Sequence, residues 1–208
     1  SPSIWREFLT YSVIGHPDDP IRGVFERAQL VRTVRGDTPS PLGVYGRTKL
    51  AGDGALLASG CEPLILRVSW VYGLRGGNFL LTMQRLMAER DALNIVDDQI
   101  GAPTWCGTIA EVTTGVVQKA LADGDSVASL RGVYHLAPSG GTSWYGFAKA
   151  IRDLFDLDCE LTPIPTTEYP TPAQRPLNSR MDCSKLVDTF GIGVPGWHEA
   201  LRECVYQA

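Results

Sequence analysis

The 208-residue sequence lacks the cysteine and histidine patterns of a disulfide framework or a metal site. Its cysteines are odd in number and widely spaced, and no two form a C-x-x-C pair: they are Cys61, Cys106, Cys159, Cys183 and Cys204. This spacing argues against a stapled secreted domain or a zinc site and indicates reduced thiols in a cytoplasmic protein. The histidines are equally scattered, so their spacing implies no metal.

Basic excess and long apolar runs are also missing. The formal net charge is −4, whereas a nucleic-acid binder would present a basic surface. No apolar run approaches the roughly 20 residues of a membrane-spanning helix, and the N-terminus lacks the charged-then-apolar layout of a signal peptide. We therefore expect a cytoplasmic protein that has neither nucleic acid nor a membrane as partner.

A third absence is the glycine-rich turn G-x-G-x-x-G, which follows the first strand of a self-sufficient dinucleotide-binding domain. The glycine-rich segment at residues 73–77 has the wrong spacing and follows a Trp-Val-Tyr turn, so it is a poor phosphate cradle. The sequence also begins without Met. A trimmed or incomplete start is consistent with both observations.

Helical and strand patterns alternate from residue 44 onward. Helices are predicted at 45–58, 78–90, 108–122, 143–154, 184–190 and 197–205, and short apolar strands at 63–68, 93–96 and 132–136. Residues 25–33 suit either a helix or a strand, and residues 163–176 form a polar, proline-rich segment for which no helix or strand is predicted. Alternating strands and helices predict an α/β fold with a largely parallel sheet.

The first of these helices begins with a tyrosine and a lysine four residues apart, Tyr45 and Lys49. Residues at i and i+4 share a helix face, so the phenol and the ammonium can point into one site. A fixed positive charge favours phenolate and lowers the tyrosine pKa, which suits a proton donor. A half-buried tyrosine beside a solvated lysine is the structural alternative.

Four segments in sequence order make the interpretation more specific: residues 43–52, 66–73, 97–105 and 175–182. Together they closely resemble dTDP-4-dehydrorhamnose reductase, a family of extended short-chain dehydrogenases/reductases. Residues 132–138 and 143–146 also look like that family, and the resemblance covers about residues 41–206. It implies an incomplete Rossmann-type parallel sheet, with residues 1–75 as a remnant of the dinucleotide-binding domain. Residues 76–208 would form most of the interleaved, smaller sugar-nucleotide-binding portion.

The resemblance implies reduction of the C4 ketone of dTDP-4-dehydro-6-deoxy-L-mannose with NADPH or NADH, giving dTDP-L-rhamnose. Tyr45 then resembles the general acid that protonates the forming alkoxide. Lys49 resembles the residue that holds the nicotinamide ribose and lowers the tyrosine pKa. Both residues would therefore be catalytic and cofactor-binding. Such chemistry needs a proton donor where negative charge develops on oxygen.

The same resemblance implies a set of substrate-binding residues: Trp70, Asn78, Gln99, Thr104 and Arg175. Trp70 follows a strand, and ligands bind at the carboxyl ends of parallel strands, although core packing is its alternative. Asn78 could instead be a helix N-cap. Arg175 suits the pyrophosphate through charge-assisted bonds, with a surface salt bridge as its alternative.

The sequence departs from the family near its start. A threonine that assists the tyrosine is expected upstream, and ungapped counting places Ile21 there; Thr10 or Ser12 would serve only with an inserted loop. Without a pyrophosphate anchor, we expect this chain alone to bind NADPH weakly or not at all. A non-catalytic binding module resembling the regulatory β subunit of methionine adenosyltransferase, and a related sugar-nucleotide epimerase, remain alternatives. A homodimer also remains open.

Overall fold

A computed structural model describes residues 11–14, 44–122, 127–169 and 175–207. The side chains of residues 11–14, 44–45 and 127–128 are outside this description. The predictions for residues 25–33, Ile21 and Thr10 lie outside the described residues, as does the side chain of Ser12. No helix in the described ranges is long and apolar enough to cross a membrane.

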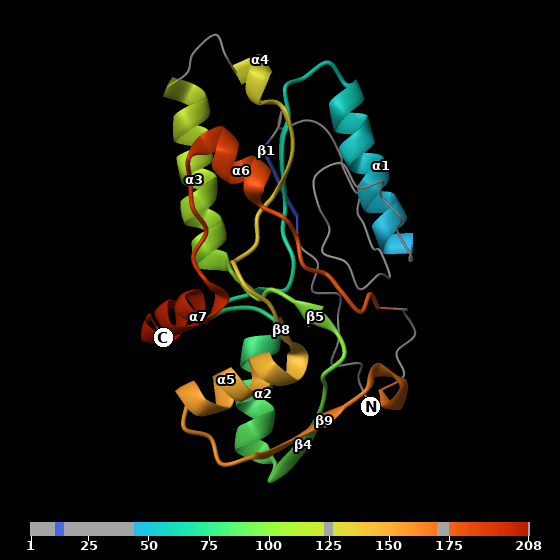
Figure 1. Ribbon diagram of the computed structural model, residues 1–208, viewed down its shortest axis with the longest axis vertical. Helices are drawn as coiled ribbons and strands as arrows, with labels where there is room; N and C mark the ends of the chain where they lie inside the picture. The colour runs from blue at the N-terminus through green and yellow to red at the C-terminus, as the bar shows by residue number, and fades with distance from the viewer. Residues whose placement is uncertain (1–10, 15–43, 123–126, 170–174, 208) are drawn as a thin grey trace.

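A three-stranded sheet with the order β1-β2-β7 organises one end of the molecule (Figure 1). It contains β1 (Tyr11–Ile14), β2 (Leu64–Arg67) and β7 (Gly132–His135). β2 and β7 are parallel, as expected, whereas β1 runs antiparallel to β2. The helices around it are α1 (Val44–Ala58), α3 (Cys106–Ala122), α4 (Val127–Leu130) and α6 (Ser184–Phe190).

The other end of the molecule is built on a parallel pair of strands, β4 (Ala92–Val96) and β9 (Glu160–Ile164). Helices α2 (Phe79–Glu89) and α5 (Trp144–Leu154) pack on each other, and α5 also contacts both strands (Figure 1). A short 3-10 helix, Thr166–Glu168, follows β9. Short strand pairs and α7 (Trp197–Tyr206) lie between the two ends: β3 (Val71–Tyr72) pairs with β6 (Thr104–Trp105), and β5 (Ile100–Gly101) with β8 (Thr142–Ser143).

Capping and amphipathic residues explain where α2 and α5 begin. The Asn78 side chain accepts a hydrogen bond from the Leu81 N–H, and the Ser143 hydroxyl accepts one from the Gly146 N–H. Each bond satisfies a backbone donor that the first helical turn leaves without a partner. The predicted stripe of α2 is buried: Phe79, Leu80, Met83, Leu86 and Met87. Both N-cap predictions are confirmed.

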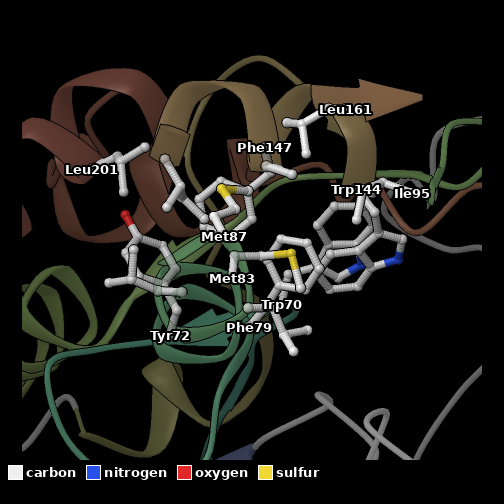
Figure 2. Close-up of a cluster of buried hydrophobic side chains, with 14 of the residues drawn as sticks. Trp70, Tyr72, Phe79, Met83, Met87, Ile95, Trp144, Phe147, Leu161 and Leu201 are labelled. Carbon is white, nitrogen blue, oxygen red and sulfur yellow. The ribbon is translucent and has the colours of Figure 1, made fainter. Parts of the chain in front are cut away.

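Two buried apolar clusters form the core. One packs β2 and β7 against α3 and α6 and includes Leu66, Val116, Leu136 and Leu186. The other joins α2, α5, β4, β9 and α7; Figure 2 shows its aromatic centre. Because residues of both clusters alternate along the chain, the two portions interleave, as the predicted fold class requires. The boundary at residue 75 stays a prediction.

The main error in the predicted elements concerns the proline-rich segment. We predicted a polar, proline-rich segment from residue 163 and no strand there, but β9 runs through Pro163 and pairs with β4 over Glu160–Ile164. Among the described strands β9 pairs only with β4, and proline is tolerated on such edge strands because one backbone N–H is not needed there. None of the five cysteines forms a disulfide within the described residues, and no cluster of metal-ligating side chains occurs in these ranges.

Candidate functional site

Helix α1 carries Tyr45 and Lys49 one turn apart. The position of the Tyr45 side chain is not part of the description, so the Tyr45–Lys49 pair stays a prediction. Lys49 is half-buried, and this burial lowers the pKa of its ammonium, while the carboxylate of Asp53 acts in the opposite direction. A lysine ammonium can donate hydrogen bonds to hydroxyl groups and stabilise a nearby phenolate.

Asp53 lies one further turn along α1 and makes a buried ion pair with Arg67 at the end of β2. The Arg67 Nη2 and Nε groups donate to Asp53 Oδ2 over 2.9 and 3.1 Å. Only 3% of Asp53 is exposed. Burial raises the pKa of the Asp53 carboxyl, while the Arg67 guanidinium lowers it. The pair joins the helix of the predicted catalytic residues to the strand that precedes Trp70.

His135 on β7 is the register partner of Arg67 in the parallel sheet. Its Nδ1 lies 3.0 Å from the carbonyl oxygen of Asp182, which can only accept, so Nδ1 carries the proton. Burial, together with the Arg67 cation, lowers the pKa of His135 from its model-peptide value of 6.5 to about 4. The imidazole is therefore neutral near pH 7.

This shift predicts a pH-dependent stability. The unfolded chain takes up a proton on His135 below about pH 6.5, whereas the folded chain resists protonation until about pH 4. The contribution is therefore fully present above pH 6.5 and is lost as pH falls towards 4, to a total of roughly 3 kcal/mol. Denaturant titrations at pH 7 and pH 5 should show a smaller difference in His135→Asn than in the unmodified chain. An equally steep loss in the variant would contradict the assignment.

Trp70 follows β2 and stacks on Trp144, the first residue of α5. Their ring centroids are 3.6 Å apart and their planes differ by 6° (Figure 2). Trp70 is 6% exposed and has a backbone φ of +51°, a left-handed conformation that costs energy in a residue with a side chain. The Thr104 N–H donates to the Trp70 carbonyl over 3.0 Å and helps to hold this turn. These contacts support the core-packing alternative; a sugar contact stays a prediction.

The backbone of Gly101 fits against the face of Trp70. A Cβ at residue 101 would lie 2.3 Å from Trp70 Cε2 and 2.7 Å from the Ser179 hydroxyl, so a larger residue would displace the indole. Ser179 belongs to the segment at residues 177–180, whose backbone bonds to Ile100 of β5 in both directions, over 2.8 Å each. Segments 66–73, 97–105, 143–146 and 175–182 thus meet around β5.

Gln99 orients Trp144. Its side-chain oxygen accepts from the Trp144 indole N–H over 3.2 Å, and its NH₂ donates to the Thr166 hydroxyl over 3.0 Å. The same hydroxyl and the Thr166 N–H donate to Asp98, next to Gln99. Both ends of the Gln99 amide are therefore engaged by protein groups. Contact of Gln99 with substrate stays a prediction, but its hydrogen bond to Trp144 joins it directly to the Trp70–Trp144 stack.

The remaining predicted residues differ in their surroundings. The Asn78 NH₂ donates to the carbonyls of Gly73 and Arg75 over 2.8 and 3.2 Å, so its side chain closes its own turn and caps α2. Thr104 is fully buried, and its hydroxyl donates to the Ala102 carbonyl. Arg175 is half-buried at the start of the segment that reaches β5. Substrate binding by these three residues stays a prediction.

Three contributors were not singled out from the sequence, although all lie in or beside the motifs: Asp53, Trp144 and Asn178. Asn178 is buried, and its side-chain oxygen accepts from the backbone and the Nε of Arg180. Its NH₂ has no hydrogen-bond partner in the described part of the chain. The signal for Asp53 was its i+4 spacing from Lys49; that for Trp144 was a tryptophan next to an N-cap serine.

Known proteins share both sequence and architecture with this chain. A dTDP-4-dehydrorhamnose reductase of Sinorhizobium fredii is 41% identical over 187 residues, covering 88% of this chain and 62% of that protein. The Escherichia coli K12 protein of that name is 40% identical over 80% of this chain and 56% of its own length. The chain thus spans about three fifths of the length of these curated relatives.

Solved structures of other proteins share the fold of this chain. A Bacillus anthracis dTDP-4-dehydrorhamnose reductase, crystallised with NADP, superimposes with a TM-score of 0.80 at 30% identity, covering 90% of this chain and 64% of that one. A Bacillus cereus UDP-glucuronic acid 4-epimerase has a TM-score of 0.68 at 18% identity over 90% of this chain and 61% of its own, a likeness of fold alone. The family described as "RmlD substrate binding domain" matches residues 24–208. The chain therefore belongs to the RmlD substrate-binding domain family.

Proposed function

We propose that this chain supplies the substrate-binding portion and the Tyr45–Lys49 pair of a dTDP-4-dehydrorhamnose reductase. The reaction would convert dTDP-4-dehydro-6-deoxy-L-mannose to dTDP-L-rhamnose. The observation that carries the proposal is that four segments resembling the family meet around β5, next to the Trp70–Trp144 stack. These segments are residues 66–73, 97–105, 143–146 and 175–182. The names of relatives about 40% identical support the same substrate class.

The proposed roles follow from the chemistry of the side chains. A reduced nicotinamide nucleotide, when bound, supplies the hydride that reaches C4 of the sugar. The phenol of Tyr45 gives its proton to the alkoxide oxygen that forms there, so no full negative charge accumulates. The Lys49 ammonium stabilises the phenolate left behind and donates hydrogen bonds to ribose hydroxyls.

The fit of a nicotinamide nucleotide to these residues is good at one end only. Lys49 is half-buried, and a lysine side chain can donate hydrogen bonds to ribose hydroxyls. The sequence has no G-x-G-x-x-G turn to hold the pyrophosphate. We therefore expect weak or no NADPH binding by the 208-residue chain alone, and tight stoichiometric binding in calorimetry would overturn that expectation.

Sugar-nucleotide binding can be measured on the 208-residue chain without any cofactor. Isothermal calorimetry with dTDP-L-rhamnose should give saturable binding. Arg175→Ala should weaken it by about tenfold or more, because a charge-assisted bond to the pyrophosphate contributes roughly 1.5–3 kcal/mol. Arg85→Ala is the matched control, since Arg85 is an exposed arginine on α2 paired with Glu89.

The outcomes separate the candidate functions. Equal binding of a UDP-sugar would favour an epimerase-like specificity, and no binding of either ligand would refute the proposed substrate. Turnover is then measured as NADPH consumption by the protein expressed from its complete reading frame. Binding of the dTDP-sugar without turnover there would favour a non-catalytic binding module.

A further inference from the structure

We propose that Gln99 is a positioning residue: it fixes the Trp144 ring and, through it, the Trp70 indole that meets the sugar. The Gln99 amide is held in turn by Thr166, in the 3-10 helix that follows β9. Only the identity of the ligand that Trp70 meets rests on the proposed function. The positioning itself stands on contacts within this chain.

A directed chain of hydrogen bonds ends on the Trp144 ring. The Trp144 indole N–H donates to Gln99 Oε1 over 3.2 Å, and Gln99 Nε2 donates to the Thr166 hydroxyl over 3.0 Å. The same hydroxyl donates to the Asp98 carboxylate, which can only accept. Because an indole N–H can only donate, these partners leave the Gln99 amide one orientation.

The segment at residues 97–99 also holds the start of α5 at a second point. The Ser143 hydroxyl donates to Asp97, and the Asp97 N–H donates to the Ile164 carbonyl at the end of β9 over 2.9 Å. The segment therefore ties both Ser143 and Trp144 to the end of β9. The first turn of α5 can move relative to this strand only if these bonds break.

The Trp144 ring in turn sets the position of Trp70. The two ring centroids are 3.6 Å apart and the planes differ by 6°, and the Phe79 ring packs 4.6 Å from Trp144 (Figure 2). Contacts between aromatic faces limit the tilt of a ring but let it slide or turn over its neighbour, whereas a hydrogen bond at the ring edge is directional. The bond to Gln99 restricts this sliding, so its loss should displace both indoles.

The test follows the tryptophan indole N–H signals of the 208-residue chain by nitrogen–proton correlation NMR, without any ligand. Trp70→Phe and Trp144→Phe assign the two signals. Gln99→Met keeps the length of the side chain but removes both hydrogen-bonding groups. In this variant the Trp144 signal should move upfield, because its proton loses a hydrogen bond. The Trp70 signal should move too, because the ring stacked on it changes position, whereas the Trp105 and Trp197 signals should stay in place.

Thr166 supplies a second pair of variants, at a residue further from the stack. Thr166→Val removes the hydroxyl that holds the Gln99 amide and should move the Trp144 and Trp70 signals. Thr166→Ser keeps the hydroxyl and should leave both where they are in the unmodified chain. Gln207→Met, at an exposed glutamine bonded to Glu203 over 2.9 Å, should move neither signal. If Gln99→Met does not fold, the two Thr166 variants still decide.

The pattern of shifts distinguishes positioning from other roles. Movement of the Trp144 signal alone would refute the proposal, because the bond to Gln99 would then have no effect on Trp70. Movement of the Trp105 and Trp197 signals as well would also refute it, since Gln99 would then only stabilise the surrounding cluster.

Calorimetry separates positioning from direct contact with the substrate. Gln99→Met and Thr166→Val should both weaken binding of dTDP-L-rhamnose by about three- to tenfold and leave binding of dTDP unchanged. A loss in Gln99→Met with none in Thr166→Val would indicate direct contact and refute the positioning role. If the unmodified chain binds no dTDP-sugar, the proposed function fails, while the NMR shifts still decide whether Gln99 positions the two indoles.

Discussion

Replacing Tyr45 with phenylalanine should lower kcat for reduction of the dTDP-4-keto sugar by about 10²–10⁴-fold. Loss of a positioned general acid has effects of this size. The substitution keeps the ring and removes only the hydroxyl, so substrate affinity should change little. The measurement is steady-state NADPH consumption by the protein expressed from its complete reading frame, with kcat and KM determined separately.

The chain provides a matched control for this substitution. Tyr145 and Lys149 on α5 repeat the Tyr-x-x-x-Lys spacing, and the Lys149 ammonium lies 5.8 Å from the centre of the Tyr145 ring. This second pair shows the structural alternative of a half-buried tyrosine beside a lysine. Tyr145→Phe should leave kcat within about twofold of the unmodified enzyme, as expected for a tyrosine without a role in proton transfer. Equal losses in both variants, or no loss in Tyr45→Phe, would contradict the assignment of Tyr45.

Local patterns in the sequence were sufficient to predict the longer helices, but not the four-residue α4 or the 3-10 helix at Thr166–Glu168. The apolar stripe of α2 and the N-cap serine of α5 act within one or two turns, so periodicity and capping reveal them. Strand β9 was missed because Pro163 normally argues against a strand. Its pairing with β4 depends on residues about 68 positions earlier in the chain, which no local signal records.

The candidate site was only partly predictable for the same reason. The motifs identified Trp70 and Gln99, but not that Trp144, 74 residues after Trp70, lies between them. The ion pair of Asp53 with Arg67 joins a helix to a strand and likewise depends on tertiary packing. Side chains that bind a substrate and side chains that position a neighbour can share one motif. Only their contacts distinguish the two roles.

The largest effect on stability should come from Phe147→Ala. Phe147 is fully buried at the centre of the larger cluster, with ring centroids of Tyr72, Phe79 and Trp197 at 5.2, 5.4 and 6.1 Å (Figure 2). Truncation removes these contacts and leaves a cavity between α5, α2 and α7, which should cost about 3–5 kcal/mol in the free energy of unfolding. Urea titration followed by tryptophan fluorescence measures this loss.

Tyr72→Phe tests the same cluster in the opposite direction. The Tyr72 hydroxyl is buried and has no hydrogen-bond partner in the described part of the chain, and burial raises its pKa. Removing a buried hydroxyl that makes no hydrogen bond should leave stability unchanged or raise it by up to about 1 kcal/mol, because its desolvation cost disappears. Tyr206→Ala, at a side chain on the surface of α7, should stay within about 0.5 kcal/mol of the unmodified chain. A large loss of stability in Tyr72→Phe would contradict the absence of a hydrogen bond to this hydroxyl.

For Phe147→Ala, a loss below about 1 kcal/mol would contradict the prediction that this cluster is the stabilising centre of this end of the molecule.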